Sequence, residues 1–178
     1  MEQITGRVWK VGDNINTDLI MPNAAYEYPP NEQPKFVFSA NRPGWSAEVQ
    51  KGDVLIGGTN FGTGSSRPAA KQLLGLGISV LIAESINGLF LRNCVNFGLP
   101  AFSCPGVSAL FNEGDTAVVD YAESIVANQR SGQSLSGRKL PSSLIQLTLS
   151  GGIVPLLQRE GFLKESENRV TIPIKASA

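Results

Sequence analysis

Hydrophobic positions are unevenly spread over the first part of the chain. Residues 4–11, ITGRVWKV, alternate apolar and polar side chains and are rich in β-branched types, which predicts a strand. Residues 12–34 are dense in Gly, Asn, Asp and Pro, so we expect a long loop or lid that is too polar to contribute to a core. Residues 35–40, KFVFSA, fit either a short strand or the start of a helix, and the pattern does not decide between them.

A regular alternation of short apolar runs and longer amphipathic segments begins at residue 53. The expected elements are a strand over 53–58, a helix over 66–77, a strand over 78–84, a helix over 85–98 and a strand over 99–104. Pro68 fits the first turn of the first helix, and Ser85 and Gly98 are the expected cap and stop of the second. This order predicts an α/β fold with a mostly parallel central sheet and crossover helices.

The last third of the chain changes character. The expected elements are a β-hairpin over 113–128, a mobile Gly/Ser-rich loop over 129–139, two helices within 140–163 separated by a pair of glycines, and a short strand with a tail over 165–178. The chain has 178 residues and shows no internal repeat. We therefore expect a single domain over residues 1–178.

Composition limits the kinds of partner that the chain is expected to bind and the cellular location that we expect for it. The 15 basic residues balance the 15 acidic ones, and only 17% of residues are charged, which disfavours nucleic acid or an anionic membrane as a partner. The N-terminal segment lacks the apolar stretch of a signal peptide, and no apolar run approaches the ~18 residues of a membrane span. The expected location is the cytoplasm.

The chain has two cysteines, Cys94 and Cys104, and no histidine. Both cysteines lie in apolar surroundings and are expected to be reduced thiols in the core. Two thiols without histidine cannot complete a zinc site or hold an iron–sulfur cluster, so we expect no metal bound by this chain. A Ser-His-Asp or Cys-His pair is excluded as well, and any catalysis requires another base or a second chain.

The strongest candidate site is the segment GTNFGTGSSRPAA, residues 58–70. It follows a predicted strand and precedes a predicted helix, where ligands gather in open α/β sheets. Its glycines allow close backbone approach, the helix N-terminus attracts anions, and Ser65, Ser66 and Arg67 add hydroxyls and a guanidinium suited to a carboxylate or phosphate. The spacing fits neither a dinucleotide fingerprint nor a Walker motif. A plainer interpretation stays open, in which Ser66 only caps the helix and Arg67 is solvated.

This segment also carries a resemblance to a known family. The run NFGTGSSRPAAKQLLGLGISVLIAESINGLFLRNCVNFGLPAF resembles the small subunit of 3-isopropylmalate dehydratase and thus the swivelling domain of the aconitase superfamily. GRVWKVGDNINTDLIMP near the start and LPSSLIQLTLSGGIVPLLQREGFL near the end extend the resemblance over most of the chain, in the same order. It implies a swivelling β/β/α fold of aconitase type.

The resemblance also implies roles for individual residues. Ser65 would be the base that removes a carbon-bound proton next to a carboxylate, while Ser66 and Arg67, with the backbone at Gly64, would bind substrate carboxylate. The [4Fe-4S] cluster would reside on a partner large subunit, and none would be bound by this chain. Asp18, in Asn-Thr-Asp, is a candidate to orient Arg67; as an alternative it is an Asx-turn residue of the loop.

Two stretches depart from the family pattern. Family members usually continue Ser-Ser-Arg with Glu-His, whereas this chain has Pro68 and Ala69. Where the family carries a segment that discriminates substrates, this chain has NAAYEYPP, which makes Ala25 and Tyr26 candidate substrate contacts. The implied substrate is 2-isopropylmalate, with another 2-hydroxy acid such as methyl- or dimethylmalate, citraconate or homoaconitate as the alternative.

Two functions of other classes stand beside this one. A non-catalytic anion-binding module of the same fold would be consistent with the changed Glu-His pair. An independent serine hydrolase is disfavoured, because the chain lacks histidine and a G-x-S-x-G elbow.

Overall fold

The structure is a computed structural model that describes residues 3–64 and 68–164. The candidate residues Ser65, Ser66 and Arg67, and the strand expected within 165–178, lie outside the described residues. The strands are β1 (Ile4–Lys10), β2 (Val54–Gly57), β3 (Val80–Ala83), β4 (Ala101–Ser103), β5 (Thr116–Asp120), β6 (Ile125–Asn128) and β7 (Ser134–Ser136). The helices are α1 (Thr17–Ile20), η1 (Asn23–Glu27), η2 (Gln33–Phe36), α2 (Trp45–Glu48), α3 (Ala69–Leu76), α4 (Gly88–Phe97), α5 (Val107–Leu110), α6 (Ser142–Leu149) and α7 (Ile153–Arg159), where η marks a 3₁₀ helix.

The seven strands form one sheet in the order β4-β3-β2-β1-β5-β6-β7. The pairs β1–β2, β2–β3 and β3–β4 are parallel, and α3 and α4 are the crossovers between β2, β3 and β4. This confirms the predicted α/β fold and the β-α-β-α-β unit. Beyond β1 the pairing turns antiparallel, through β5, β6 and β7. The hairpin expected over 113–128 is formed by β5 and β6.

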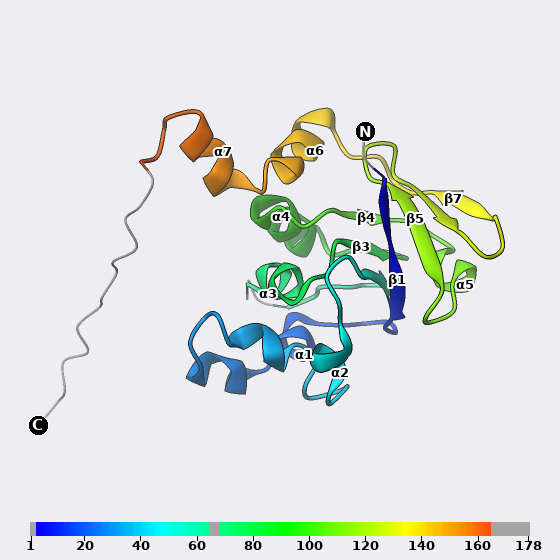
Figure 1. Cartoon of the computed structure of the whole chain (residues 1–178), viewed down its shortest axis with the longest axis horizontal. Helices are drawn as coiled ribbons and strands as arrows, with labels where there is room; N and C mark the ends of the chain where they lie inside the picture. Colours follow the sequence, from blue (N-terminus) through cyan, green and yellow to red (C-terminus); the bar gives the residue numbers. More distant parts are fainter. Residues whose placement is uncertain (1–2, 65–67, 165–178) are drawn as a thin grey trace, which may run out of the picture.

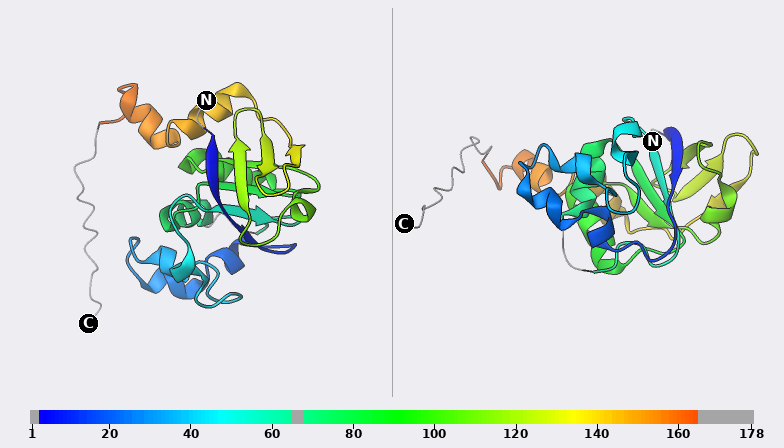
Figure 2. Two further views of the ribbon diagram at one scale, coloured as in Figure 1. Left: turned by 45° about the vertical axis from the view of Figure 1, so that its right-hand side comes forward. Right: turned by 90° about the horizontal axis from the view of Figure 1, so that it is seen from below.

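The antiparallel half curls over one face of the parallel half (Figures 1 and 2). One hydrophobic cluster joins residues of both halves, including Val8, Val54, Ile82 and Val126. The backbone N–H of Arg138, just after β7, donates to the carbonyl of Ser103 at the end of β4, with 2.7 Å between the heavy atoms. The two edges of the sheet thus approach each other and enclose this core.

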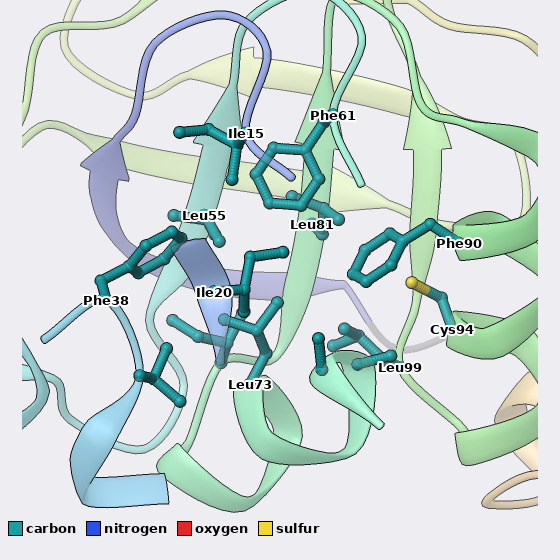
Figure 3. Packing of buried hydrophobic residues seen from close by; sticks show 14 of the residues in the cluster. Ile15, Ile20, Phe38, Leu55, Phe61, Leu73, Leu81, Phe90, Cys94 and Leu99 are labelled. Atoms are coloured by element: carbon teal, nitrogen blue, oxygen red, sulfur yellow. The ribbon is translucent and has the colours of Figure 1, made fainter. Parts of the chain in front are cut away.

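A second core fills the space between the opposite face of the sheet and the helices (Figure 3). It includes Ile15, Ile20, Met21 and Ala25, all buried, from the segment expected to be a polar loop. The expectation that residues 12–34 are too polar for a core was therefore wrong. Short helices α1, η1 and η2 satisfy the backbone locally and turn the few apolar side chains of this segment inward.

Three local predictions need correction. The expected cap of α4, Ser85, lies outside the helix, and the side chain of Asn87 accepts the N–H of Leu89 instead. Residues 129–139, expected to be a mobile loop, contain β7, which pairs with β6. The ambiguous segment 35–40 forms neither a strand nor a long helix, since only its first two residues belong to η2. Gly98 does end α4, with φ of 78°.

Both cysteines are buried free thiols, as expected. Burial raises the pKa of the Cys94 thiol far above its ordinary value, and burial, with a smaller effect of Glu84, raises that of Cys104. The thiols are thus core residues with little thiolate at neutral pH. Within residues 3–64 and 68–164, no helix is long and apolar enough to cross a membrane.

The Asp53 carboxylate links the start of β2 to β1 and is expected to contribute strongly to stability. Its Oδ2 accepts hydrogen bonds from the Arg7 guanidinium (2.8 Å), from the Trp9 indole (2.7 Å) and from the backbone N–H of Gln50 (2.9 Å). Burial raises the pKa of Asp53, but these bonds outweigh it and lower the pKa below the ordinary value.

Replacing Asp53 with alanine is expected to lower the free energy of unfolding by about 2–3 kcal/mol, since it leaves the buried indole N–H unpaired. The native carboxyl titrates below the unfolded value of about 3.9. Its contribution is therefore present above about pH 4 and is lost as the pH falls through the native pKa. Urea unfolding at pH 7 measures the change, with the exposed Glu27→Ala as control. A difference below about 0.5 kcal/mol between the two variants would contradict this role.

Candidate functional site

The candidate site lies where the parallel strands end. Residues 12–17 follow β1, residues 58–64 follow β2 and residues 84–87 follow β3, so three polar segments meet at the carboxyl edge of the sheet. The N–H of Gly58 donates to the carbonyl of Gly12 at 3.2 Å, and the N–H of Asn14 donates to the carbonyl of Thr59 at 2.8 Å. The segments after β1 and β2 therefore run side by side beyond the sheet.

We call residues 58–64 the glycine loop. On one side, Asn16 and Thr63 form a parallel bridge, and the N–H of Gly62 donates to the carbonyl of Ile15 at 2.6 Å. On the other side, Phe61 and Ile86 form a second parallel bridge. Hydrogen bonds on both sides thus fix the course of this loop up to residue 64.

Two glycines in this loop occupy positions that suit no other residue. Gly62 has φ of +81°, and a Cβ there would lie 2.2 Å from Cγ of Phe90. Gly64 has φ of +104°, and its Cβ would lie 3.1 Å from Oγ1 of Thr17. The loop therefore packs closely on the ring of Phe90 and on the start of α1. The rings of Phe61 and Phe90 are neighbours in the core (Figure 3), and their centroids are 5.5 Å apart.

The structure brings the predicted site residues Asp18 and Gly64 close together, although they come from different strand ends. The N–H of Thr17, the residue before Asp18, donates to the carbonyl of Thr63, the residue before Gly64, at 2.8 Å. Asp18 is exposed in the first turn of α1. The side chain that caps α1 belongs to Asn16, which accepts the N–H of Leu19 at 2.8 Å.

The three residues with the most specific predicted roles, Ser65, Ser66 and Arg67, are among those that the structure does not describe. Helix α3 begins at Ala69, later than expected, and its N-cap is Pro68. The plainer interpretation placed Ser66 at the cap of this helix, and that position belongs to Pro68 instead. The described residues that flank this segment are thus Gly64, at the end of the glycine loop, and Pro68, the N-cap of α3.

The two predicted specificity residues are placed differently. Ala25 is fully buried in the core between the helices and the sheet. Tyr26 follows it on η1 with 48% of its surface exposed. Of the two, Tyr26 is the side chain at the surface.

Sequence reasoning gave no individual role in the site to six polar residues at this edge: Asp13, Asn14, Thr59, Asn60, Glu84 and Ser85. The hydrogen bond from the Thr59 N–H lowers the pKa of Asp13. Burial raises the pKa of Glu84, but the amides of Gly106 and Ser108 donate to it and lower the pKa below its usual value. One available signal was the position of these residues directly after predicted strands.

The described residues do not fit a metal cluster. Across residues 3–64 and 68–164, no three or more His, Cys, Asp and Glu side chains gather in a way that could hold a metal ion. The whole sequence has two cysteines, and both are buried in the core. An iron–sulfur cluster needs more thiolates than this chain has.

Comparison with known proteins agrees with this geometry. A profile of the aconitase C-terminal domain matches residues 6–104. The chain is 42% identical over 159 residues to the isopropylmalate/citramalate isomerase small subunit of Methanocaldococcus jannaschii, covering 88% of this chain and 95% of that protein. It is 38% identical over 160 residues to 3-isopropylmalate dehydratase small subunit 1 of Methanopyrus kandleri, covering 89% and 94%.

A solved structure extends the agreement to three dimensions. The crystal structure of 3-isopropylmalate dehydratase from Methanocaldococcus jannaschii matches with a TM-score of 0.83 at 26% identity, over 90% of this chain and 96% of that one. Matched profile, sequence relatives and fold all point the same way. The chain belongs to the aconitase C-terminal domain family, among the small subunits of 3-isopropylmalate dehydratase.

Proposed function

We propose that this chain is the small subunit of a heteromeric hydro-lyase that converts 2-isopropylmalate into 3-isopropylmalate by dehydration and rehydration, a step of leucine biosynthesis. The observation that carries the proposal is the parallel bridge between Asn16 and Thr63. It joins the Asn-Thr-Asp segment to the glycine loop, the two motifs through which the sequence resembles this family. Residues 1–178 would act as one swivelling domain in the cytoplasm.

The chain would supply carboxylate binding and proton removal. Ser66, Arg67 and the backbone at Gly64 hold a substrate carboxylate, and Asp18 orients the guanidinium of Arg67. Ser65 takes the carbon-bound proton next to that carboxylate. A serine alkoxide is too basic to persist in water, so nearby N–H groups and the guanidinium must stabilise it.

The remainder of the site would come from a cluster-bearing large subunit. We place the [4Fe-4S] cluster there because this chain has too few thiolates for it. When bound, the cluster supplies a Lewis acid for the departing hydroxyl. A small subunit alone is therefore expected to be inactive.

A second substrate is favoured by the name of one relative. The Methanocaldococcus jannaschii protein is an isopropylmalate/citramalate isomerase small subunit, so a methyl-substituted malate is the second candidate. The segment after α1 presents Tyr26 at the surface, while Ala25 is buried. The side chain of Tyr26 would then contact the alkyl group of either substrate.

The test is an anaerobic reconstitution with a cluster-loaded large subunit. Formation of an unsaturated acid from 2-isopropylmalate and from citramalate is followed by ultraviolet absorbance, with each subunit alone as control. We expect turnover only in the mixture. If no 2-alkylmalate turns over while the isolated chain binds one in calorimetry, the chain is an anion-binding module and not an enzyme subunit.

A further inference from the structure

Five exposed polar residues join three strand ends at the carboxyl edge of the sheet. We call them the asparagine clasp: Asp13 and Asn14 after β1, Thr59 and Asn60 after β2, and Ser85 after β3. The Nδ2 of Asn60 donates to Oδ1 of Asn14 at 3.0 Å, and the backbone N–H of Asn60 donates to Oγ of Ser85 at 2.8 Å. Asn60 is thus tied to both neighbouring segments.

The backbone at the clasp is unusual on both sides. Asn14 has φ of +55° and Asn60 has φ of +60°, a left-handed conformation that asparagine tolerates better than most residues. The N–H of Thr59, next to Asn60, donates to Oδ1 of Asp13 at 2.6 Å. The turn at the start of the glycine loop is therefore specified by backbone conformation and by side-chain hydrogen bonds together.

The turn at Asn60 sets the direction of the rest of the glycine loop. Directly after it, Phe61 is fully buried, and Gly62 lies against the ring of Phe90. The loop then reaches Gly64, the last described residue before Ser65. A change in the angle of the turn would move both the buried ring and the end of the loop.

Exposure argues against a role in stability alone. The clasp residues lie at the surface, and hydrogen bonds in contact with water contribute little to the free energy of folding. An exposed clasp can instead define the course of the glycine loop. This matters for catalysis because catalytic groups tolerate very little displacement.

We propose that Asn60, held by Asn14 and Ser85, is a positioning residue that fixes the course of the glycine loop up to Gly64, the residue before the proposed base Ser65. The inference rests on the proposed function, because a displaced glycine loop would be detected as a lower kcat of the proposed reaction.

In the reconstituted enzyme, Asn60→Ala is expected to lower kcat by about 10- to 100-fold and to leave KM within about threefold. Asn60→Gly keeps the left-handed backbone but loses the amide, so we expect a smaller loss. Gly132→Ala is the matched control, since Gly132 has φ of +71° in the β6–β7 turn, with open space for a Cβ. It imposes similar backbone strain far from the loop and should leave kcat unchanged.

A second readout needs no activity. In the full-length chain without a partner, amide hydrogen exchange of Gly62, whose N–H donates to Ile15, is expected to be at least about tenfold faster in Asn60→Ala. It should be unchanged in Gly132→Ala. Unaltered exchange in Asn60→Ala, or a kcat within about twofold of wild type in an active complex, overturns the proposal. An inactive wild-type complex would refute the proposed function, and the exchange experiment would still decide whether Asn60 positions the loop.

Discussion

Replacing Ser65 with alanine is expected to lower kcat of the reconstituted enzyme by about 10²- to 10⁴-fold, the usual loss when a general base is removed. KM should change little, because the carboxylate contacts proposed for Ser66 and Arg67 remain. The expectation has a chemical basis: the chain has no histidine, and both of its cysteines are buried in the core. Initial rates of unsaturated acid formation, measured over a range of substrate concentrations, separate kcat from KM.

Two further variants make the result specific. Ser66→Ala should raise KM more than it lowers kcat, since the proposed role of Ser66 is binding. Ser136→Ala, at an exposed position of strand β7, should match the wild type. If Ser65→Ala retains a rate within about threefold of the wild type, Ser65 is not the base, whatever the other variants do.

Much of the fold was predictable from local pattern. The strands predicted over 53–58, 78–84 and 99–104 are centred on short apolar runs, and such runs between amphipathic segments are typical of parallel strands buried on both faces. Gly98 marked a helix end correctly, because its left-handed φ is a local requirement that sequence reveals directly.

What pattern could not reveal depends on contacts between distant segments. Ile15 is an isolated apolar residue and Ile20 belongs to a run of only three, Leu19 to Met21, in a mostly polar stretch, so their place in the core depends on how this segment packs against the sheet and the helices. Strand β7 is short and polar, and it exists because β6 offers it a free edge. Composition alone identifies neither case.

The site divides in the same way. The glycine loop was recognisable from sequence, but the residues that hold it were not. Asn60 and Ser85 are 25 residues apart and meet only because β2 and β3 are parallel neighbours that end at the same edge. A motif thus predicts the candidate reacting groups, whereas the topology of the sheet brings together the residues that we propose to position them.

Gly62→Ala is expected to lower the free energy of unfolding by about 2–5 kcal/mol. Two costs add: left-handed backbone strain of about 1–2 kcal/mol, and overpacking of about 1–3 kcal/mol from a methyl group that would lie 2.2 Å from Cγ of Phe90. Neither the loop nor α4 has room to yield easily, since Gly62 donates to Ile15 and Phe90 is buried against Phe61. Urea unfolding of the full-length chain measures the loss.

Gly44→Ala separates the two costs. Gly44 has φ of +85° but open space for a Cβ, so this variant should lose only the strain, about 1–2 kcal/mol. Phe90→Ala removes Cγ and Cδ1, which would lie 2.2 and 2.5 Å from the methyl group at position 62, and keeps only the Cβ contact at 2.4 Å. The double variant should therefore be more stable than the sum of the single losses predicts, by at least about 1 kcal/mol. Additive losses would show that the ring of Phe90 does not constrain the glycine loop.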